Sequence, residues 1–187
     1  MHYFPLFINI KKFKVLVVGG GEIAFDKVQK LLDFSNEVTI LSKEYSLKIQ
    51  NIIKKHNLKT LQKEYQLGDI DNFDIVIVAV DDINIQKNIY LESRKKRILC
   101  NCVDVIEYCD FIFGSYIKQD DLVISISTSG SSPAVAKHLK RFLQNSLPNS
   151  LNQFLTYMKS LRLNIPKSKE RMKMFDQKAK EYFDNLN

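Results

Sequence analysis

The sequence contains few cysteines and no long hydrophobic run. Its three cysteines are an odd number, and its first residues show no basic stretch followed by an apolar one, so structural disulfides and a signal peptide are not expected. The longest apolar runs have about six residues, far short of the ~20 that a membrane-spanning helix needs. We therefore expect a globular protein without a membrane partner, located in the cytoplasm by default.

Patterns typical of nucleic-acid binding are also missing. The chain shows no helix-turn-helix, zinc-finger or aromatic RNA-binding signature, although 28 Lys and Arg against 21 Asp and Glu give a formal net charge of +7. Such a charge suits an anionic partner, and it is equally typical of a lysine-rich solvated surface. With no nucleic-acid motif beside the charge, we do not expect a nucleic-acid partner.

No metal-ligand cluster is visible either. Cys100 and Cys102 stand two residues apart in a predicted strand, which places both side chains on one face. The three histidines lie far from them in the sequence. These cysteines are therefore predicted to be buried strand residues, and no bound metal is predicted.

The most informative segment follows the apolar run Val15–Val18. It reads Gly-Gly-Gly-Glu-Ile-Ala over residues 19–24, which fits the G-x-G-x-x-A pattern of a dinucleotide-binding loop between a strand and a helix. A glycine triplet alone is as typical of a tight turn as of a cofactor site. The helical spacing that follows and the second strand at 38–41 favour the cofactor site. The candidate cofactor-binding residues here are Gly19, Gly20, Gly21, Glu22 and Ile23.

Strands and helices alternate up to about residue 110. Predicted strands at 15–18, 38–41, 58–61, 73–80 and 97–103 are separated by helical patterns, the one after residue 82 being short. This alternation predicts an α/β fold with a Rossmann-type doubly wound parallel sheet, whose ligands bind at the carboxyl ends of the strands. Gly19, Ser42, Asp81 and Asp104 all fall at such ends.

The pattern changes after residue 110. Two strands at 111–117 and 122–127 are joined directly by a turn, and a hydroxyl-rich loop leads into a helix with Ser132 as N-cap and Pro133 as its first residue. That loop is suited to binding carboxylates or phosphates, and ordinary capping explains it equally well. Two amphipathic stripes after Pro148 and Pro166 predict a C-terminal helical domain that packs on the rest of the chain or on a second subunit.

Several motifs occur together in a recognisable order. They are Phe4-Pro5-Leu6-Phe7, Val18 to Ala24 with Lys27, Ala79-Val80-Asp81-Asp82, Cys100-Asn101-Cys102-Val103-Asp104, Phe111-Ile112 and Ser129-Gly130-Ser131-Ser132-Pro133. In these motifs the chain resembles the precorrin-2 dehydrogenases, which also form the N-terminal module of siroheme synthases. The resemblance extends over essentially the whole chain.

The resemblance implies a fold and an activity. It implies an NAD-binding Rossmann domain over 1–113, a dimerisation segment over 114–147 and a helical domain over 148–187, assembled as a homodimer. The implied reaction is the NAD-dependent oxidation of precorrin-2 to sirohydrochlorin in siroheme biosynthesis. This polycarboxylate tetrapyrrole would give the positive charge a purpose. Some relatives also insert Fe²⁺ as a substrate, which this sequence does not decide, and the methyltransferase module fused in others is expected to be absent.

The resemblance also assigns site residues. Asp104 matches the catalytic aspartate, which accepts or steers the proton lost with the hydride; the alternative is a residue that caps the loop after a strand. Substrate-binding residues are Asn101, Ser127, Thr128, Ser129, Gly130, Ser131 and Ser132, with Thr128 standing where some relatives carry a phosphorylatable serine. Ser42, Lys43, Glu44 and Asp81 complete the cofactor set. Glu44 suits the ribose hydroxyls of NAD and Lys43 a 2′-phosphate, so NADP stays open.

A second hypothesis is a non-catalytic module that senses NAD to regulate a partner. Such a sensor needs no carboxylate beside the nicotinamide, so replacing Asp104 would leave its function intact. A dehydrogenase in which Asp104 is replaced would still bind NAD but would lose turnover.

Overall fold

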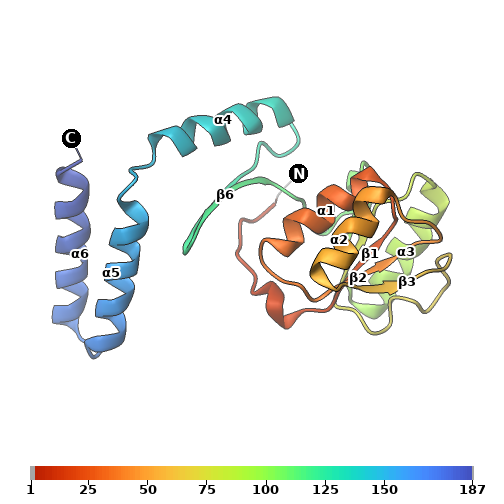
Figure 1. Cartoon of the computed structure of the whole chain (residues 1–187), viewed down its shortest axis with the longest axis horizontal. Helices are drawn as coiled ribbons and strands as arrows, with labels where there is room; N and C mark the ends of the chain where they lie inside the picture. The colour runs from red at the N-terminus through yellow and green to blue at the C-terminus, as the bar shows by residue number, and fades with distance from the viewer. Residues whose placement is uncertain (1–2, 187) are drawn as a thin grey trace. The chain divides into compact units, whose positions relative to one another are not determined.

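The computed structural model describes residues 3–186, and these form two compact units, 3–112 and 113–186. Figure 1 shows the strands and helices of both units. No helix within the described residues is long and apolar enough to span a membrane.

The first unit is built on a five-stranded sheet. Its strands are β1 (Val15–Val18), β2 (Val38–Leu41), β3 (Lys59–Leu61), β4 (Ile75–Val78) and β5 (Leu99–Cys102). The sheet order is β3-β2-β1-β4-β5, and every neighbouring pair is parallel. The chain moves outward from β1 to β3 and then returns to the other side of β1. The carboxyl ends of β1 and β4 therefore flank the switch point, where doubly wound sheets bind their ligands.

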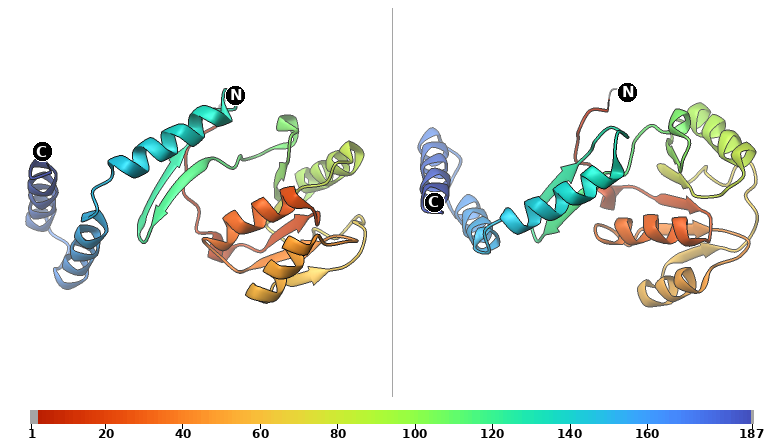
Figure 2. Two further views of the ribbon diagram at one scale, coloured as in Figure 1. Left: turned by 45° about the horizontal axis from the view of Figure 1, so that its top comes forward. Right: turned by 90° about the horizontal axis from the view of Figure 1, so that it is seen from above.

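Helices cover both faces of this sheet. The helices α1 (Glu22–Leu32) and α2 (Leu47–His56) lie on one face and α3 (Ile83–Lys96) on the other, as Figure 2 shows. Two single-turn 3₁₀ helices, Ile10–Lys12 and Ile106–Tyr108, complete the unit. The predicted short helix after residue 82 is wrong in length, because α3 has 14 residues and ends at Lys96, followed by the C-cap Arg97 with a left-handed φ of 58°.

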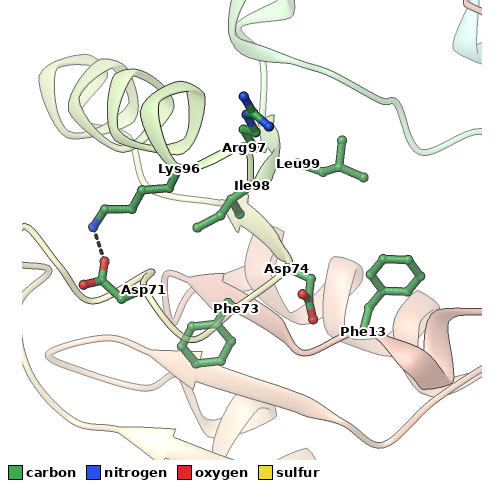
Figure 3. A pocket seen from close by; sticks show the side chains of 8 residues that line it. All are labelled: Phe13, Asp71, Phe73, Asp74, Lys96, Arg97, Ile98 and Leu99. Carbon is green, nitrogen blue, oxygen red and sulfur yellow. Dashed lines mark hydrogen bonds and ion pairs between the residues drawn. The ribbon is translucent and has the colours of Figure 1, made fainter.

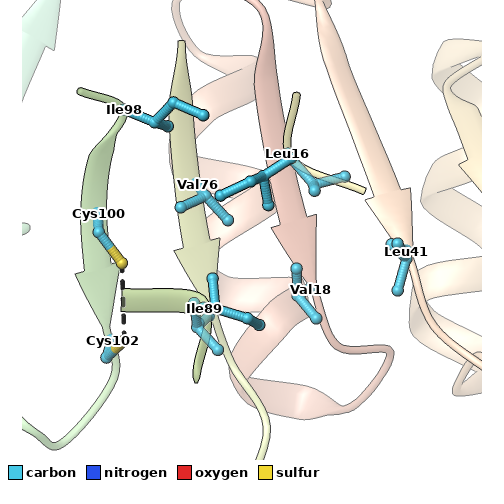
Figure 4. Close-up of a cluster of buried hydrophobic side chains, with 10 residues drawn as sticks. Leu16, Val18, Leu41, Val76, Ile89, Ile98, Cys100 and Cys102 are labelled. Atoms are coloured by element: carbon cyan, nitrogen blue, oxygen red, sulfur yellow. Dashed lines mark hydrogen bonds between the residues drawn. The ribbon is translucent and has the colours of Figure 1, made fainter. Parts of the chain in front are cut away.

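The core follows from the apolar strands. All four residues of β1 and of β4 are buried, as expected for parallel strands that are covered on both faces. Figure 4 shows the α3 side of this core, where Leu16, Val76 and Ile89 pack with Cys100 and Cys102. The two sulfur atoms are 3.7 Å apart and both thiols are free. The prediction of buried strand cysteines on one face is confirmed.

A return segment after β5 runs back along that strand. Asp110 exchanges hydrogen bonds with Cys100: its main-chain N–H donates to the Cys100 carbonyl at 2.8 Å, and its carboxylate accepts from the Cys100 N–H at 2.8 Å. Asn101 donates from Nδ2 to the Phe111 carbonyl at 2.8 Å. These contacts hold residues 109–111 outside the second sheet. The strand predicted from residue 111 therefore begins only at Ser115.

The second unit contains a hairpin and three helices. β6 (Ser115–Gln119) pairs antiparallel with β7 (Leu122–Ile126), and α4 (Pro133–Ser146) packs against both strands. α5 (Leu151–Asn164) and α6 (Lys169–Asp184) contact each other through stacked Phe154 and Tyr182 rings, whose centroids are 4.1 Å apart. The predicted division of this region at residue 147, with a dimerisation segment before it, stays a prediction.

Candidate functional site

The glycine loop leaves β1 in a conformation that needs its first glycine. Gly19 has a φ of +131°, and a Cβ atom there would lie 2.2 Å from the Ala79 carbonyl oxygen. Its N–H donates to the Leu41 carbonyl at 2.8 Å. The turn is therefore pressed between the carboxyl ends of β2 and β4, and only glycine fits there.

Gly20 is closely packed for a different reason. A Cβ atom on Gly20 would lie 1.9 Å from the Glu44 carbonyl oxygen and 2.8 Å from Ser42 Oγ. The Gly20 carbonyl also accepts a 2.8 Å hydrogen bond from Ser46 N. Gly20 thus joins the loop to the segment that follows β2, the segment predicted to bind the ribose.

Gly21 is the glycine of this loop that has open space beside it. No heavy atom lies within 4 Å of where its Cβ would be. It is the N-cap of α1 and, as a glycine, offers no side chain to cap that helix end. Unoccupied N–H groups and the positive end of the helix dipole suit a pyrophosphate, and the missing side chain allows it to approach the backbone. The residues present fit a dinucleotide cofactor.

The side chains near the glycine loop differ in their partners and in their exposure. Glu22 pairs with Lys48 at 2.5 Å, and Lys43 pairs with Glu64 at 3.0 Å, which raises the pKa of Lys43. Ile23 is 39% exposed. Glu44 is exposed at its side chain and contacts the glycine loop through its main chain. No carboxylate stands at position 42, where NAD-binding folds commonly carry one.

Two aspartates follow β4 and have different surroundings. Asp82 caps α3, accepting from Asn84 N at 2.8 Å and from Ile85 N at 3.3 Å. Asp81 stays exposed at the carboxyl end of β4, beside the switch point. The capping role of Asp82 was not predicted, although an aspartate three residues before a helical apolar position is a usual sign of an N-cap.

Asn101 on β5 is buried with one polar atom unsatisfied. Its side chain is 5% exposed and donates to Phe111, while Oδ1 has no hydrogen-bond partner within residues 3–186. Because side chains alternate along a strand, Asn101 faces away from Cys100 and Cys102 and toward the α1 side of the sheet. An unsatisfied buried acceptor at this place suits an N–H donor of a ligand.

Asp104 stands in a turn just past the end of β5. The Val105 N–H donates to the Cys102 carbonyl at 3.4 Å, and Asp104 has a left-handed φ of 68°. Aspartate tolerates this conformation better than most residues. The carboxylate is exposed. It follows the carboxyl end of β5, which is the neighbour of β4 in the sheet. The site of the first unit thus combines the glycine loop, residues 42–44, Asp81, Asn101 and Asp104 at one edge of one sheet.

Lys27 of α1 is a further charged residue on this side, and the sequence analysis gave it no role. It is half-buried. Burial lowers the pKa of Lys27 and the neighbouring Lys30 lowers it further, whereas the negative charges of Asp104 and Asp26 act in the opposite direction. The shared motifs of the sequence include Lys27, but its place beside the end of β5 follows only from the facing side of α1.

The hydroxyl-rich loop belongs to the second unit. Thr128 Oγ1 donates to the Ser132 carbonyl at 3.1 Å and accepts from the Ser132 N–H at 3.3 Å, while Ser127 Oγ accepts from Ser129 N at 3.1 Å. Ser132 Oγ accepts from Val135 N at 3.2 Å, which confirms the predicted cap of α4. Ser131 and Gly130 complete the turn, with Gly130 at a φ of +84°. Substrate binding by this loop stays a prediction.

A surface hollow of about 540 Å³ lies elsewhere on the first unit. Figure 3 shows Phe73, Asp74, Ile98 and Leu99 around it, and Lys96 paired with Asp71 beside it. These residues precede or begin β4 and β5, so the hollow is at the amino ends of the strands, opposite to the glycine loop. Among the described residues, no group of three or more His, Cys, Asp or Glu side chains is placed to hold a metal ion.

Comparison with known families supports the interpretation of this edge. Residues 6–115 match the family model described as "Putative NAD(P)-binding". The chain belongs to this family. The match covers the glycine loop, all five strands of the parallel sheet and Asp104.

Two curated relatives of this chain are named as siroheme synthases. It is 36% identical over 153 residues to siroheme synthase 1 of Serratia proteamaculans (strain 568), covering 82% of this chain and 32% of the relative. It is 34% identical over 151 residues to the siroheme synthase of Blochmanniella floridana, covering 81% and 33%. The chain therefore spans about a third of the length of these relatives, and the predicted resemblance to siroheme synthases is confirmed.

A solved structure shows the same fold. The structure of SirC, a precorrin-2 dehydrogenase, matches with a TM-score of 0.77 and 24% sequence identity, covering 90% of this chain and 85% of that one. The predicted Rossmann-type sheet followed by a C-terminal helical region is confirmed.

Proposed function

We propose that this protein is an NAD-dependent precorrin-2 dehydrogenase that forms sirohydrochlorin for siroheme biosynthesis. The names of its relatives and of the structural neighbour support this reaction. The observation that carries the proposal is the placement of Asp104 at the same edge of the sheet as an uncapped helix N-terminus with open space at Gly21.

The roles of the residues follow from this arrangement. The N–H groups at the start of α1 and the open backbone at Gly21 bind the pyrophosphate. Bound NAD supplies the acceptor for the hydride. The substrate gives up a hydride and a proton as a carbon–carbon double bond extends its conjugation, and the exposed Asp104 carboxylate accepts or steers that proton. Asn101 Oδ1 accepts a hydrogen bond from an N–H group of the ligand.

NAD rather than NADP is the proposed acceptor. The Lys43 ammonium is 3.0 Å from the Glu64 carboxylate, so the one cation within residues 42–44 is already paired with an anion. Although a surface pair of this kind is weak, it reduces the attraction for a 2′-phosphate.

Turnover by an Asp104→Asn variant tests the proposal. We expect wild-type protein under anaerobic conditions to convert precorrin-2 and NAD to sirohydrochlorin, followed by absorbance. The variant should bind NADH with an unchanged Kd and lose roughly 100-fold or more of kcat, the usual scale for a general acid or base. A variant that turns over normally would contradict the role of Asp104. Wild-type protein that binds NADH without oxidising precorrin-2 would favour the alternative, an NAD-sensing module.

Iron insertion is tested with the same preparation. We propose Fe²⁺ as a second substrate, on the grounds that the macrocycle itself provides nitrogen ligands. Adding Fe²⁺ to enzymatically formed sirohydrochlorin should then give the siroheme spectrum faster than in a protein-free control. Equal rates with and without protein would limit the activity to dehydrogenation.

We also propose that the protein is a homodimer formed through the second unit. On α4, Val135, Leu139 and Phe142 are 56%, 40% and 66% exposed and follow helical spacing, while the other side of α4 packs on the β6–β7 hairpin. Phe142→Glu should produce a monomer in light scattering, and Lys137→Glu on the same helix should not. A wild-type monomer at micromolar concentration would contradict this proposal.

A further inference from the structure

The α1 helix carries Lys27 on the side that faces β5. Helical geometry shows which side this is. Ala24, Val28 and Leu31 are the buried residues of α1 and face the sheet. Because each residue turns the helix by 100°, Phe25 and Lys27 leave the helix on opposite sides of that buried stripe.

The contacts of Phe25 show which strands lie beneath each of these two sides of α1. The Lys48 ammonium of α2 is 5.7 Å from the Phe25 ring centroid and pairs with Glu22. α2 connects β2 to β3 on this same face, so the Phe25 side of α1 faces β2 and β3. The sheet order then leaves the Lys27 side above β4 and β5.

This side of α1 faces the carboxyl end of β5. The groups that act on the pKa of Lys27 are Asp26 and Lys30 of α1, together with Asp104 and the Cys109 thiol from the segment that follows β5. Cys109 in turn lies against β5, donating from Sγ to the Cys102 carbonyl at 3.0 Å. Lys27 is half-buried and lies in the second turn of the helix whose first turn is the cofactor site.

We propose that Lys27 is a positioning residue for Asp104, its ammonium holding the catalytic carboxylate in place at the end of β5. This inference rests on the proposed function for its catalytic consequence. The left-handed turn at Asp104 leaves the carboxylate exposed, where side-chain freedom would otherwise spread it over several rotamers. A half-buried ammonium on the adjacent side of α1 limits that freedom by favouring the rotamers that bring the carboxylate toward it.

A measurement without turnover tests the pairing itself. The Lys27 ¹³Cε resonance, assigned by its loss in Lys27→Met, is titrated by NMR in the wild type and in Asp104→Asn. Removing the carboxylate should lower the pKa of Lys27, because the negative charge at Asp104 favours its charged form. Asp33→Asn, which removes a carboxylate at the far end of α1 that is not among the groups given above for Lys27, is the matched control. Equal effects of the two substitutions would overturn the proposal.

Turnover then tests the consequence. Lys27→Met should lower kcat roughly tenfold, about 1.4 kcal/mol, with NADH affinity unchanged, and Lys27→Arg should restore most of it. Lys30→Met, one turn further along α1, should be neutral. In Asp104→Asn, adding Lys27→Met should cost nothing more, as expected for residues that act as a unit. Additive losses would overturn the proposal, whereas a wild type that does not oxidise precorrin-2 would remove the proposed function and leave the NMR result standing.

Discussion

Substituting alanine at Gly21 and at Gly20 separates cofactor binding from folding. Both positions lie in the same glycine loop and both changes add one methyl group. At Gly21 the new Cβ meets no atom within 4 Å, and its φ of −90° is open to any residue. At Gly20 the Cβ would lie 1.9 Å from the Glu44 carbonyl oxygen, so the backbone must move. The two variants are therefore expected to fail in opposite ways.

The magnitudes follow from these contacts. Gly21→Ala keeps the fold, and its unfolding free energy should change by less than about 1 kcal/mol, the scale of an N-cap replacement. The methyl group occupies the space for the pyrophosphate and weakens its charge-assisted hydrogen bonds, each worth about 1.5–3 kcal/mol. NADH affinity should therefore fall by roughly 10- to 100-fold. Gly20→Ala should cost about 1–3 kcal/mol by overpacking, lowering Tm by about 2–4 °C per kcal/mol.

The assay pairs calorimetric titration with NADH and thermal melting by circular dichroism. The expected pattern is a weakened Kd at wild-type Tm for Gly21→Ala, and a lowered Tm for Gly20→Ala. The control is Gly68→Ala outside this loop, where the φ of +99° strains any alanine. It should lower Tm and leave the Kd for NADH unchanged. If Gly21→Ala binds NADH as tightly as wild type, the pyrophosphate does not lie at the start of α1 and the reasoning is refuted.

Other parts of the chain give further predictions. Burial and the hydrogen bond to Glu92 raise the pKa of Tyr65, so its stabilising contribution is complete below the unfolded-state value near 10 and is lost as pH rises above it; Tyr65→Phe should flatten the alkaline part of a stability–pH curve. Lys43→Ala should change the NADP Kd by less than about threefold, since Glu64 already pairs with this ammonium; a larger loss would point to a 2′-phosphate site. Ser132→Ala should lower the unfolding free energy by about 1 kcal/mol through loss of the α4 cap, measured by urea denaturation.

Elements that depend only on residues close together in the sequence were predicted correctly. The glycine loop, the apolar β4 run and the Ser132-Pro133 helix start all depend on neighbouring residues, and each was found in the expected place. The length of α3 was missed, because its apolar residues end at Leu91 and the remaining turn is polar up to the left-handed Arg97.

Long-range contacts explain what the sequence did not reveal. Asn101 was predicted as a site residue, but its hydrogen bond to Phe111, ten positions away, is what keeps that segment from starting a strand. Lys27 received no role because helical spacing alone does not say which strands lie beneath α1; that needs the sheet order and the position of α2. The catalytic role of Asp104 stays a prediction at a position that the topology places on the appropriate edge.

The return segment after β5 has a consequence for self-association. Edge strands with unpaired main-chain groups attract strands of other molecules. Here Asp110 takes up both main-chain groups of Cys100, and Arg94 fixes its carboxylate at 2.6 Å. The sheet is thereby closed to extension at this border, so copies of the protein are not expected to join into a continuous sheet across β5.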